Sequence, residues 1–339
     1  MSFQLQKIQK ETKLSIIIVN YNTLQLTCRC LDSVFKYLKE VSFLWEVILI
    51  DNGSTDGSVE AFMQYRNLFI IENPDNRGFS KANNQGILRA KGVLILLLNS
   101  DVIVTENSFS KLVEIAEKHD NLGALGCTLR NLDGSLQATI SVFPNLLSIF
   151  LRILNFSEKK PLNYFLRKRL AHHNKFYSFI FGKTISSYLF SQSTDRPDIE
   201  HVDWITGACF LIPQNVIDKI GLLDEDFFMY AEDVDWCKRI LRNGFTILRY
   251  NKTSMIHDTN RYGDIRFKKL SSVRLKSIIL FYKKYYGWCK NTLLRILIIS
   301  SVSIKIVFLI LSMIFTKTKS NIIKELKENR KLINLAIYE

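Results

Sequence analysis

Short apolar segments alternate with helical stretches along the first part of the chain, and this alternation restricts the possible folds more than any other feature. Four segments are apolar at nearly every position and rich in β-branched residues, so neither face of the sheet that they form can meet water. Such strands, separated by helices, are typical of a mostly parallel sheet with helices on both faces. The sequence predicts strands over Leu14–Asn20, Glu46–Asp51, Leu68–Glu72 and Val93–Asn99, and helices over Gln25–Leu38, Ser58–Tyr65 and Lys81–Ala90.

The later part of the chain returns to this alternation after an interruption. Residues Phe143–Tyr188 are aromatic and basic without a regular period, so we interpret them as a variable helical insert or lid within the range 143–200. Pro213 suits the start of a helix and Gly244 suits the end of one. The sequence predicts further helices over Ser108–His119, Pro213–Ile220 and Glu232–Asn243, and further strands over Leu122–Cys127, Val202–Ile212 and Phe245–Tyr250.

Two acidic tripeptides follow apolar anchors at distant points of the chain. Asn99-Ser100-Asp101 ends a predicted strand, and Ala231-Glu232-Asp233 begins a predicted helix. The carboxyl edge of an open α/β sheet is where ligands bind, and a carboxylate there suits a divalent cation that holds a diphosphate. A second carboxylate can remove a proton, so the pair fits sugar transfer from a nucleotide. A helix-start acid also complements the helix dipole, and the residues alone leave both interpretations of Asp233 open.

The turns after the first strands exclude two common nucleotide-binding loops. Neither Val19–Asn22 nor Asp51–Gly57 contains a G-x-G-x-x-G pattern or a P-loop lysine. Asp51 at a strand end can instead accept hydrogen bonds from a base or a ribose, whereas we interpret Asp56 as a capping residue. Gly78 opens a predicted helix, where backbone can approach a ligand and the helix N-terminus favours a diphosphate.

Six blocks occur in order along the chain and are followed by His257: VNYN, DNGSTDGS, NRGFSKANNQG, LLLNSD, VDWITGACFLIP and GLLDEDFFMYAEDVDWCKRI. In combination and in this order, they resemble the family 2 inverting glycosyltransferases of the GT-A fold. The resemblance covers about Leu14 to His257, and within the family the likeness is to bacterial rhamnosyltransferase-type enzymes of surface polysaccharide assembly. It implies an α/β fold with a nucleotide-binding, mostly parallel sheet flanked by helices.

The resemblance implies roles for individual residues of this sequence. Asp101 stands where such enzymes carry the last acid of D-x-D and would bind Mg²⁺ or Mn²⁺, with His257 as a second ligand. Asn99 replaces the first acid of that pattern, which puts the metal affinity in doubt. Asp233 matches the general base. Because adjacent helical positions point in different directions, we expect only one of Glu232 and Asp233 to face the anomeric carbon, and we expect Asp235 to face away. The implied donor-binding residues are Val19, Asn20, Tyr21, Asp51, Asn76, Gly78, Asn83, Asn99 and Ser100, and the implied acceptor-binding residues are Trp204, Thr206, Gly207 and Glu232.

The C-terminal region is basic and apolar at once. Residues 261–339 contain 17 Lys and Arg against 4 Asp and Glu, a net charge of +13 within a chain total of +14. Interleaved aromatic and aliphatic residues make anionic lipid the expected partner of this charge, and no nucleic-acid-binding motif accompanies it. Ile296–Phe315 is long enough to cross a bilayer, but the central Lys305 favours a helix that lies in or on the membrane. A buried helix of the soluble domain is the third possibility.

These observations lead to one leading hypothesis and two alternatives. We expect a metal-dependent glycosyltransferase at the cytoplasmic face of the plasma membrane, peripheral or single-pass, that uses a dTDP- or UDP-sugar, rhamnose being favoured, and a lipid-linked glycan acceptor. The 6 scattered cysteines suit a reducing compartment, and Met1–Lys13 lacks an apolar secretory segment. The alternatives are a nucleotidyltransferase and a membrane-bound scaffold that has lost catalysis. We expect a donor half over 14–128, an acceptor half over 129–260 and a helical C-terminal region over 261–339.

Overall fold

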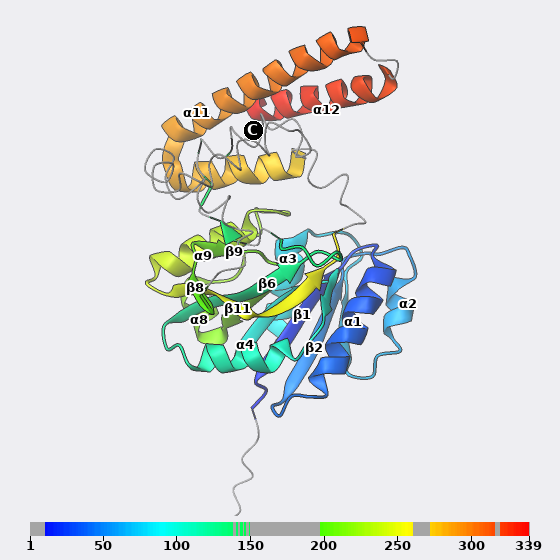
Figure 1. The fold of residues 1–339 in the computed structure, drawn as a ribbon, viewed down its shortest axis with the longest axis vertical. Coiled ribbons are helices and arrows are strands. Elements are labelled where there is room, and N and C mark those ends of the chain that lie inside the picture. Colours follow the sequence, from blue (N-terminus) through cyan, green and yellow to red (C-terminus); the bar gives the residue numbers. More distant parts are fainter. Residues whose placement is uncertain are drawn as a thin grey trace, which may run out of the picture.

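The computed structural model has a nine-stranded mixed sheet at its centre (Figure 1). The strand order is β3-β2-β1-β4-β10-β6-β11-β5, and β8 pairs with β11. The block β3-β2-β1-β4 is parallel, as is the pair β6–β11, whereas β10, β5 and β8 run antiparallel to their neighbours. The structure describes residues 11–137, 140–141, 143–144, 146, 149, 197–259, 272–315 and 319–338.

The first four long strands form where the apolar segments predict them and end together. In their registers Asn20 lies opposite Asp51, and Val19 lies opposite Asn99. The polar residues that follow three apolar runs therefore gather at one edge of the sheet, the carboxyl edge. These strands are β1 (Leu14–Asn20), β2 (Trp45–Asp51), β3 (Leu68–Glu72) and β4 (Leu94–Asn99).

Helices cover both faces of the sheet, as the sequence predicts. Ile16 and Ile18 of β1 pack into a core cluster with α1, α2 and α4, while Ile17 packs into a second cluster with α3, α8 and α9. Alternate side chains of one strand thus reach opposite faces, which explains the continuous apolar runs. The helices are α1 (Leu24–Leu38), α2 (Ser58–Phe62) and α4 (Ser108–Glu117) on one face, and α3 (Phe79–Arg89), α8 (Gln214–Ile220) and α9 (Glu232–Arg242) on the other.

The later strands differ from the prediction in two places. The strand predicted over Val202–Ile212 is broken at residues 206–208, because Trp204 and Ile205 leave the main sheet to pair with Ile140 and Ser141. The last strand continues beyond the predicted end at Tyr250, because its second half pairs with the short β5. The remaining strands are β5 (Val102–Val104), β6 (Leu122–Arg130), β7 (Ile140–Ser141), β8 (Ile199–His201), β9 (Trp204–Ile205), β10 (Cys209–Pro213) and β11 (Thr246–His257).

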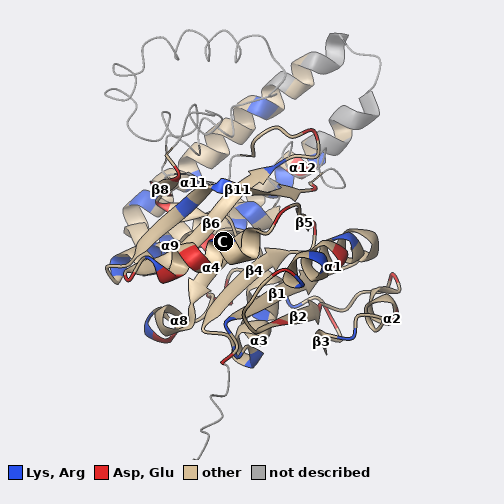
Figure 2. Cartoon of the chain, turned by 60° about the horizontal axis from the view of Figure 1, so that its bottom comes forward, with Lys and Arg blue, Asp and Glu red and all other residues tan. Residues whose placement is uncertain are grey.

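Two long helices form the C-terminal part and lie together beyond one end of the sheet (Figure 1). They are α11 (Ser272–Phe315) and α12 (Lys319–Tyr338). Gly287 interrupts α11 with a φ of 73° and a ψ of 178°, so the chain turns and a second helical segment starts there. Lys and Arg recur along both helices (Figure 2). Most of the predicted insert lies outside the described residues, and residues 199–201 at its end form β8.

The second segment of α11 packs against α12, and the first packs against the main domain. Leu294, Ile298 and Val302 are buried in one cluster with Leu332 and Ala336 of α12. The same cluster includes Leu275 and Ile279 from the first segment and Phe227 and Val234 from beside the start of α9. Among the described residues, one helix, residues 272–311, is long and apolar enough to cross a membrane, and 24% of its most apolar window is buried.

Candidate active site

The ends of β1 and β2 form a buried polar network at the carboxyl edge. The Nδ2 atom of Asn20 donates to Oδ1 of Asp51 at 2.6 Å and to Oγ of Ser54 at 3.0 Å. The backbone N–H of Ser54 donates to the other oxygen of Asp51 at 2.8 Å. Asp51 is only 2% exposed, so these bonds fix its carboxylate in place. Each oxygen has a further lone pair, which leaves Asp51 able to accept from a base or a ribose.

A second set of polar contacts brings the NSD tripeptide to the same network. Oδ1 of Asn20 accepts from Oγ1 of Thr23 at 2.7 Å, and that hydroxyl lies 3.3 Å from Oγ of Ser100. Asn99 lies beside Val19 in the sheet, and the ring of Tyr21 is 44% exposed at the same edge. The residues predicted from the VNYN and LLLNSD blocks therefore lie together.

Asn76, Gly78 and Asn83 lie next to this network, and their contacts are with protein atoms. Oδ1 of Asn76 accepts from Nδ2 of Asn52 and from the backbone N–H of Gly78, both at 3.0 Å. A Cβ at Gly78 would lie 2.5 Å from the carbonyl oxygen of Phe228, so the missing side chain makes room for that loop. Nδ2 of Asn83 donates to the carbonyl of Phe79 at 2.9 Å, one helical turn earlier.

Asp101 and His257 meet because β5 pairs with the end of β11. Val102 lies opposite His257, which brings Nε2 of His257 to 3.0 Å from Oδ1 of Asp101. Nδ1 of the same ring lies 2.9 Å from Oε1 of Gln137, while Nε2 of Gln137 donates to the carbonyl of His257 at 2.8 Å. This arrangement fixes the amide of Gln137, so Nδ1 of His257 donates to its carbonyl oxygen and Nε2 faces Asp101.

The pair Asp101–His257 fits a divalent cation. Nε2 of His257 is buried and has no hydrogen-bond donor among the described residues, although it lies close to a carboxylate oxygen. A carboxylate oxygen and an imidazole nitrogen are both ligands that divalent cations accept, and a carbonyl oxygen on the other ring nitrogen is the usual support of a metal-binding histidine. No group of three or more potential protein ligands occurs in the described part of the chain. Water and phosphate oxygens would supply the remaining ligands, as is usual for Mg²⁺.

The second acidic tripeptide is connected to the end of β4 through residues 206–208. The backbone N–H of Asn99 donates to the carbonyl of Ala208 at 3.1 Å, and the N–H of Gly207 donates to Oδ2 of Asp233 at 3.1 Å. The break in the predicted strand thus supplies the loop that links the two acidic tripeptides. Thr206 is part of the same loop and accepts from the N–H of Ala208 at 3.4 Å, and Trp204 stands just before it in β9.

An unusual backbone presents the acidic pair. Tyr230 and Ala231 have φ values of 71° and 67°, a left-handed conformation that residues with a Cβ rarely adopt. Helix α9 starts directly after them at Glu232. Strained backbone of this kind is retained where the surrounding structure requires it, often at functional sites. Here it places two carboxyl groups at the first turn of a helix.

The two carboxyl groups of this pair have different surroundings. Burial and the charge of Asp233 raise the pKa of Glu232 well above its usual value, and its Oε2 has no hydrogen-bond partner within the described ranges. Burial also raises the pKa of Asp233, but the N–H groups of Gly207 and Val234 and the charge of Arg274 oppose this. Asp233 is therefore the carboxyl that ionises first, and Glu232 retains its proton to higher pH.

Replacing Glu232 with glutamine should stabilise the protein at neutral pH. Because the pKa of Glu232 is raised by folding, the stability it contributes is complete below its unfolded-state pKa and is lost as the pH rises through its folded-state pKa. Glutamine does not ionise, so the free energy of unfolding of Glu232→Gln should exceed that of the wild type increasingly as the pH rises above the unfolded-state pKa of Glu232, and the two should be similar in acid. Urea denaturation over a pH series measures the difference. Glu40→Gln, at an exposed position, is the control, and a difference that does not vary with pH would contradict the assignment.

Asp235 belongs to a structural network and faces away from the site, as predicted. It is fully buried, and its oxygens accept from Nε of Arg239 at 2.9 Å and from the hydroxyl of Tyr285 at 2.7 Å. Nζ of Lys284 also lies 2.7 Å from it. The network connects α9 to the first segment of α11, so the predicted appendage supports the helix that carries Asp233.

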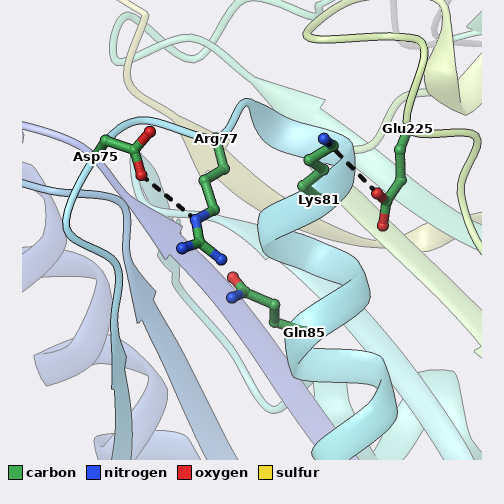
Figure 3. Close-up of a pocket in the computed structure, with 5 residues that line it drawn as sticks. All are labelled: Asp75, Arg77, Lys81, Gln85 and Glu225. Atoms are coloured by element: carbon green, nitrogen blue, oxygen red, sulfur yellow. Dashed lines mark hydrogen bonds and ion pairs between the residues drawn. The ribbon is translucent and has the colours of Figure 1, made fainter.

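A cavity of about 460 Å³ lies beside α3, outside the predicted site (Figure 3). Its charged side chains pair with each other: Arg77 with Asp75 at 3.4 Å and Lys81 with Glu225 at 4.0 Å. Gln85 completes the lining. None of the predicted site residues is part of this cavity, and the sequence analysis did not single it out.

The sequence analysis missed two residues that contact the predicted site. Gln137 supports His257 from a segment without periodicity, so no local pattern could indicate it. Arg274 acts on Asp233 from the first turns of α11 and lies over the ring of Tyr230 at 5.9 Å. The sequence analysis did not identify Arg274 as a site residue, because the positive charge of its segment was interpreted as a membrane-binding feature.

Comparisons with known proteins agree with this geometry. The profile described as glycosyl transferase family 2 matches residues 15–190, just over half of the chain. The chain is 24% identical over 260 residues to the N-acetylglucosaminyl-diphospho-decaprenol L-rhamnosyltransferase of Mycobacterium tuberculosis, covering 73% of this chain and 78% of that protein. It is 23% identical over 249 residues to the low-salt glycan biosynthesis hexosyltransferase Agl10 of Haloferax volcanii, covering 72% and 67%.

Solved structures share the fold. The mannosyltransferase PcManGT from Pyrobaculum calidifontis, in complex with GDP-Man and Mn²⁺, gives a TM-score of 0.52 at 13% identity over 97% of this chain and 87% of that one. GalNAc-T7 with UDP, GalNAc and Mn²⁺ gives 0.53 at 17% identity over 81% of this chain and 48% of that one. These likenesses confirm the predicted GT-A architecture of a mostly parallel sheet flanked by helices. The chain belongs to glycosyl transferase family 2, and it is a glycosyltransferase.

Proposed function

We propose that the enzyme transfers a sugar, with inversion, from a nucleoside diphosphate donor to a lipid-linked glycan acceptor. The observation that supports this most directly is the short connection between the two acidic tripeptides. Asp101 follows β4 and lies against His257 at the end of β11, and Asp233 accepts from the loop that is hydrogen-bonded to β4. A metal–diphosphate and a general base on one edge are the groups that a single displacement at an anomeric carbon requires.

The network at the ends of β1 and β2 would hold the nucleoside. Asp51 is fixed by Asn20 and Ser54 and retains the capacity to accept hydrogen bonds from a pyrimidine base or its ribose. Tyr21 offers an exposed ring beside it. We propose a dTDP- or UDP-sugar on this basis, with Val19, Asn76, Gly78, Asn83, Asn99 and Ser100 completing the donor side.

Asp101 and His257 would hold Mg²⁺ or Mn²⁺ at the donor diphosphate. When bound, the cation neutralises the negative charge that develops on the leaving diphosphate. Gln137 orients the imidazole so that Nε2 faces Asp101. The Mn²⁺ present in the two related structures is consistent with such a site. Asn99 in place of an acid reduces the negative charge there and weakens the hold on the cation.

Asp233 would act on the acceptor. Its carboxylate takes the proton from an acceptor hydroxyl while the oxygen attacks the anomeric carbon from the face opposite the leaving nucleoside diphosphate. The bond from that carbon to the diphosphate oxygen breaks, and no covalent enzyme intermediate forms. Glu232, which retains its proton, would donate a hydrogen bond to the acceptor, and Trp204, Thr206 and Gly207 would complete the acceptor side.

The acceptor and the sugar are proposed from the relatives and from the C-terminal region. The mycobacterial relative is named for the transfer of L-rhamnose to N-acetylglucosaminyl-diphospho-decaprenol. The apolar and basic helices α11 and α12 would keep the enzyme at the cytoplasmic face of the membrane, near such an acceptor. We retain the predicted division into a donor half over 14–128, an acceptor half over 129–260 and a C-terminal region over 261–339.

A donor screen tests the proposal. The full chain is incubated with dTDP-rhamnose, UDP-sugars and GDP-sugars, with and without Mg²⁺ or Mn²⁺, and both the melting temperature and the released nucleotide are measured. A true donor raises the melting temperature by mass action, and the effect should require the cation. Transfer releases a nucleoside diphosphate, whereas release of pyrophosphate would indicate a nucleotidyltransferase. Binding without release in the presence of a lipid-linked acceptor would indicate a scaffold that has lost catalysis.

A further inference from the structure

The interruption of α11 at Gly287 creates a cavity that the catalytic proposal does not use. Its volume is about 430 Å³, and it lies between the end of the first segment of α11, the start of the second segment and the C-terminal turn of α12. We call it the kink cavity. Its lining residues are Lys283, Gly287, Trp288, Asn291, Thr292, Arg295 and Ile337.

The kink cavity has the charge distribution of an anion site. The first N–H groups of a helix have no partner within it, and the second segment of α11 starts at Gly287, which lines the cavity. Lys283 approaches from the preceding helical turn, and Arg295 approaches from two turns further on. No Asp or Glu occurs anywhere in Ser272–Phe315, so the positive charge is not neutralised from within α11.

Asn291 adds an independent indication of a ligand. The residue is only 7% exposed, and its Oδ1 is buried without a hydrogen-bond partner among the described residues. A buried amide oxygen is unfavourable unless a donor reaches it. Because Asn291 lines the kink cavity, an occupant that carries a hydroxyl group would supply that donor. The cavity therefore suits a ligand with both a phosphate and a hydroxyl.

The surface around the kink cavity is that of a membrane-contacting helix. Trp288 is 79% exposed, and Leu293 and Ile296 on the next turns are 45% and 55% exposed. Tryptophan prefers the head-group level of a bilayer, and exposed aliphatic residues beside cations are typical of helices in the membrane plane. Further along the same segment, Ile304, Val307, Ile310 and Leu311 are also between 43% and 55% exposed.

The packing of α12 favours a helix that lies along the membrane over one that crosses it. Arg295 donates from Nη1 to the carbonyl of Ala336 at 3.0 Å, which joins α12 to α11 at the kink cavity. Helix α12 carries five Lys and Arg and two Glu, and a pair of helices with these charges is costly to place in hydrocarbon. The exposed apolar side of α11 can instead enter the head-group region from one side.

We propose that the kink cavity binds the head group of an anionic glycerophospholipid with a free hydroxyl, as in phosphatidylglycerol. The phosphate would contact Lys283, Arg295 and the N–H groups after Gly287, and the glycerol hydroxyl would donate to Asn291. The site is distinct from the acceptor site, because Arg274 near Asp233 lies 13 residues before Gly287, about 20 Å along the helix axis. The inference specifies which lipid the C-terminal region would contact. It rests on the proposed function only for the choice of membrane.

Vesicle binding by the full chain tests this inference. Sedimentation with phosphatidylcholine vesicles is compared with vesicles that contain phosphatidylglycerol or phosphatidylmethanol at equal surface charge. We expect binding to phosphatidylglycerol to be several-fold tighter, because the head group of phosphatidylmethanol has the same charge and no hydroxyl group. Lys283→Gln should weaken it more than Lys290→Gln, which removes the same charge from the same helix outside the cavity. Asn291→Leu should abolish the preference for phosphatidylglycerol while binding to anionic vesicles persists.

Other outcomes would overturn the inference. Equal effects of Lys283→Gln and Lys290→Gln, with no preference between the two anionic lipids, would reduce the binding to general electrostatics. Displacement from vesicles by inorganic phosphate at matched ionic strength would indicate a site for free phosphate. Far-ultraviolet circular dichroism shows whether each variant is folded. Nucleotide release is measured separately, so transfer activity in a chain without lipid preference would contradict the kink-cavity proposal and leave the proposed transferase function intact.

Discussion

Asp233→Asn should reduce the turnover number by about 10²–10⁴-fold, the range that a positioned general base contributes. Asparagine preserves the shape of the side chain and can still face the N–H of Gly207 through its carbonyl oxygen. It cannot take a proton from the acceptor hydroxyl. Donor binding should survive, because Asp51 and the Asp101–His257 pair are unchanged. The measurement is the initial rate of nucleoside diphosphate release, together with the cation-dependent rise in melting temperature on adding donor.

Asp226→Asn is the matched control for this variant. It makes the same chemical change on the exposed loop before α9, so it should leave both the rate and the donor binding close to those of the wild type. Turnover in Asp233→Asn at the level of this control would remove the general-base assignment. Loss of donor binding together with turnover would instead show that Asp233 belongs to the donor side.

Asp101→Ala should impair binding and turnover together. The substitution removes the carboxylate 3.0 Å from Nε2 of His257, and with it the anionic ligand of the proposed cation site. We expect the turnover number to fall by about 10²–10³-fold, since charge on the leaving diphosphate would be poorly stabilised. The increase in melting temperature that donor and Mn²⁺ produce together should disappear. Titration of Mg²⁺ and Mn²⁺ against the initial rate measures the change in cation dependence.

Donor binding should survive in Asp233→Asn and be lost in Asp101→Ala, and this difference separates the roles of the two residues. His257→Gln should resemble Asp101→Ala in direction, and Asp133→Ala, on an exposed turn, should have no effect. A cation dependence that survives in Asp101→Ala would place the cation elsewhere. If donor alone, without a cation, stabilised the wild type fully, the metal requirement itself would be wrong.

The strands of the donor half could be predicted because burial on both faces leaves little choice of residue. β1 and β3 have the bounds that the apolar runs predict, and β2 and β4 differ from the prediction by one residue at their starts. The carboxyl-edge position of Asp51 and Asn99 then follows from parallel pairing. The start of α9 could be predicted for a different reason, since an apolar anchor followed by acids is typical of the first turn of a helix.

The remaining features depend on contacts that no local pattern records. The proximity of Asp101 and His257 requires β5 and β11 to pair across more than 150 residues. Gly78 was predicted as a position where backbone approaches a ligand, and no local pattern indicates that the backbone of Phe228 packs against it. The strand predicted over Val202–Ile212 breaks because Trp204 and Ile205 pair with β7, and only that pairing exposes the loop that binds Asp233.

The contacts between α9 and α11 have a practical consequence for work on this enzyme. Asp235 is wholly buried, and two of its three bonding partners, Lys284 and Tyr285, come from α11. A truncated protein that stops before residue 272, made to avoid detergent, would leave Arg239 as the one remaining partner of Asp235 among these three and would expose the apolar surface of Phe227 and Val234. Such a fragment would tend to aggregate, and the helix that carries Asp233 would lose its support, so inactivity of the fragment would say nothing about whether the intact enzyme needs a bilayer.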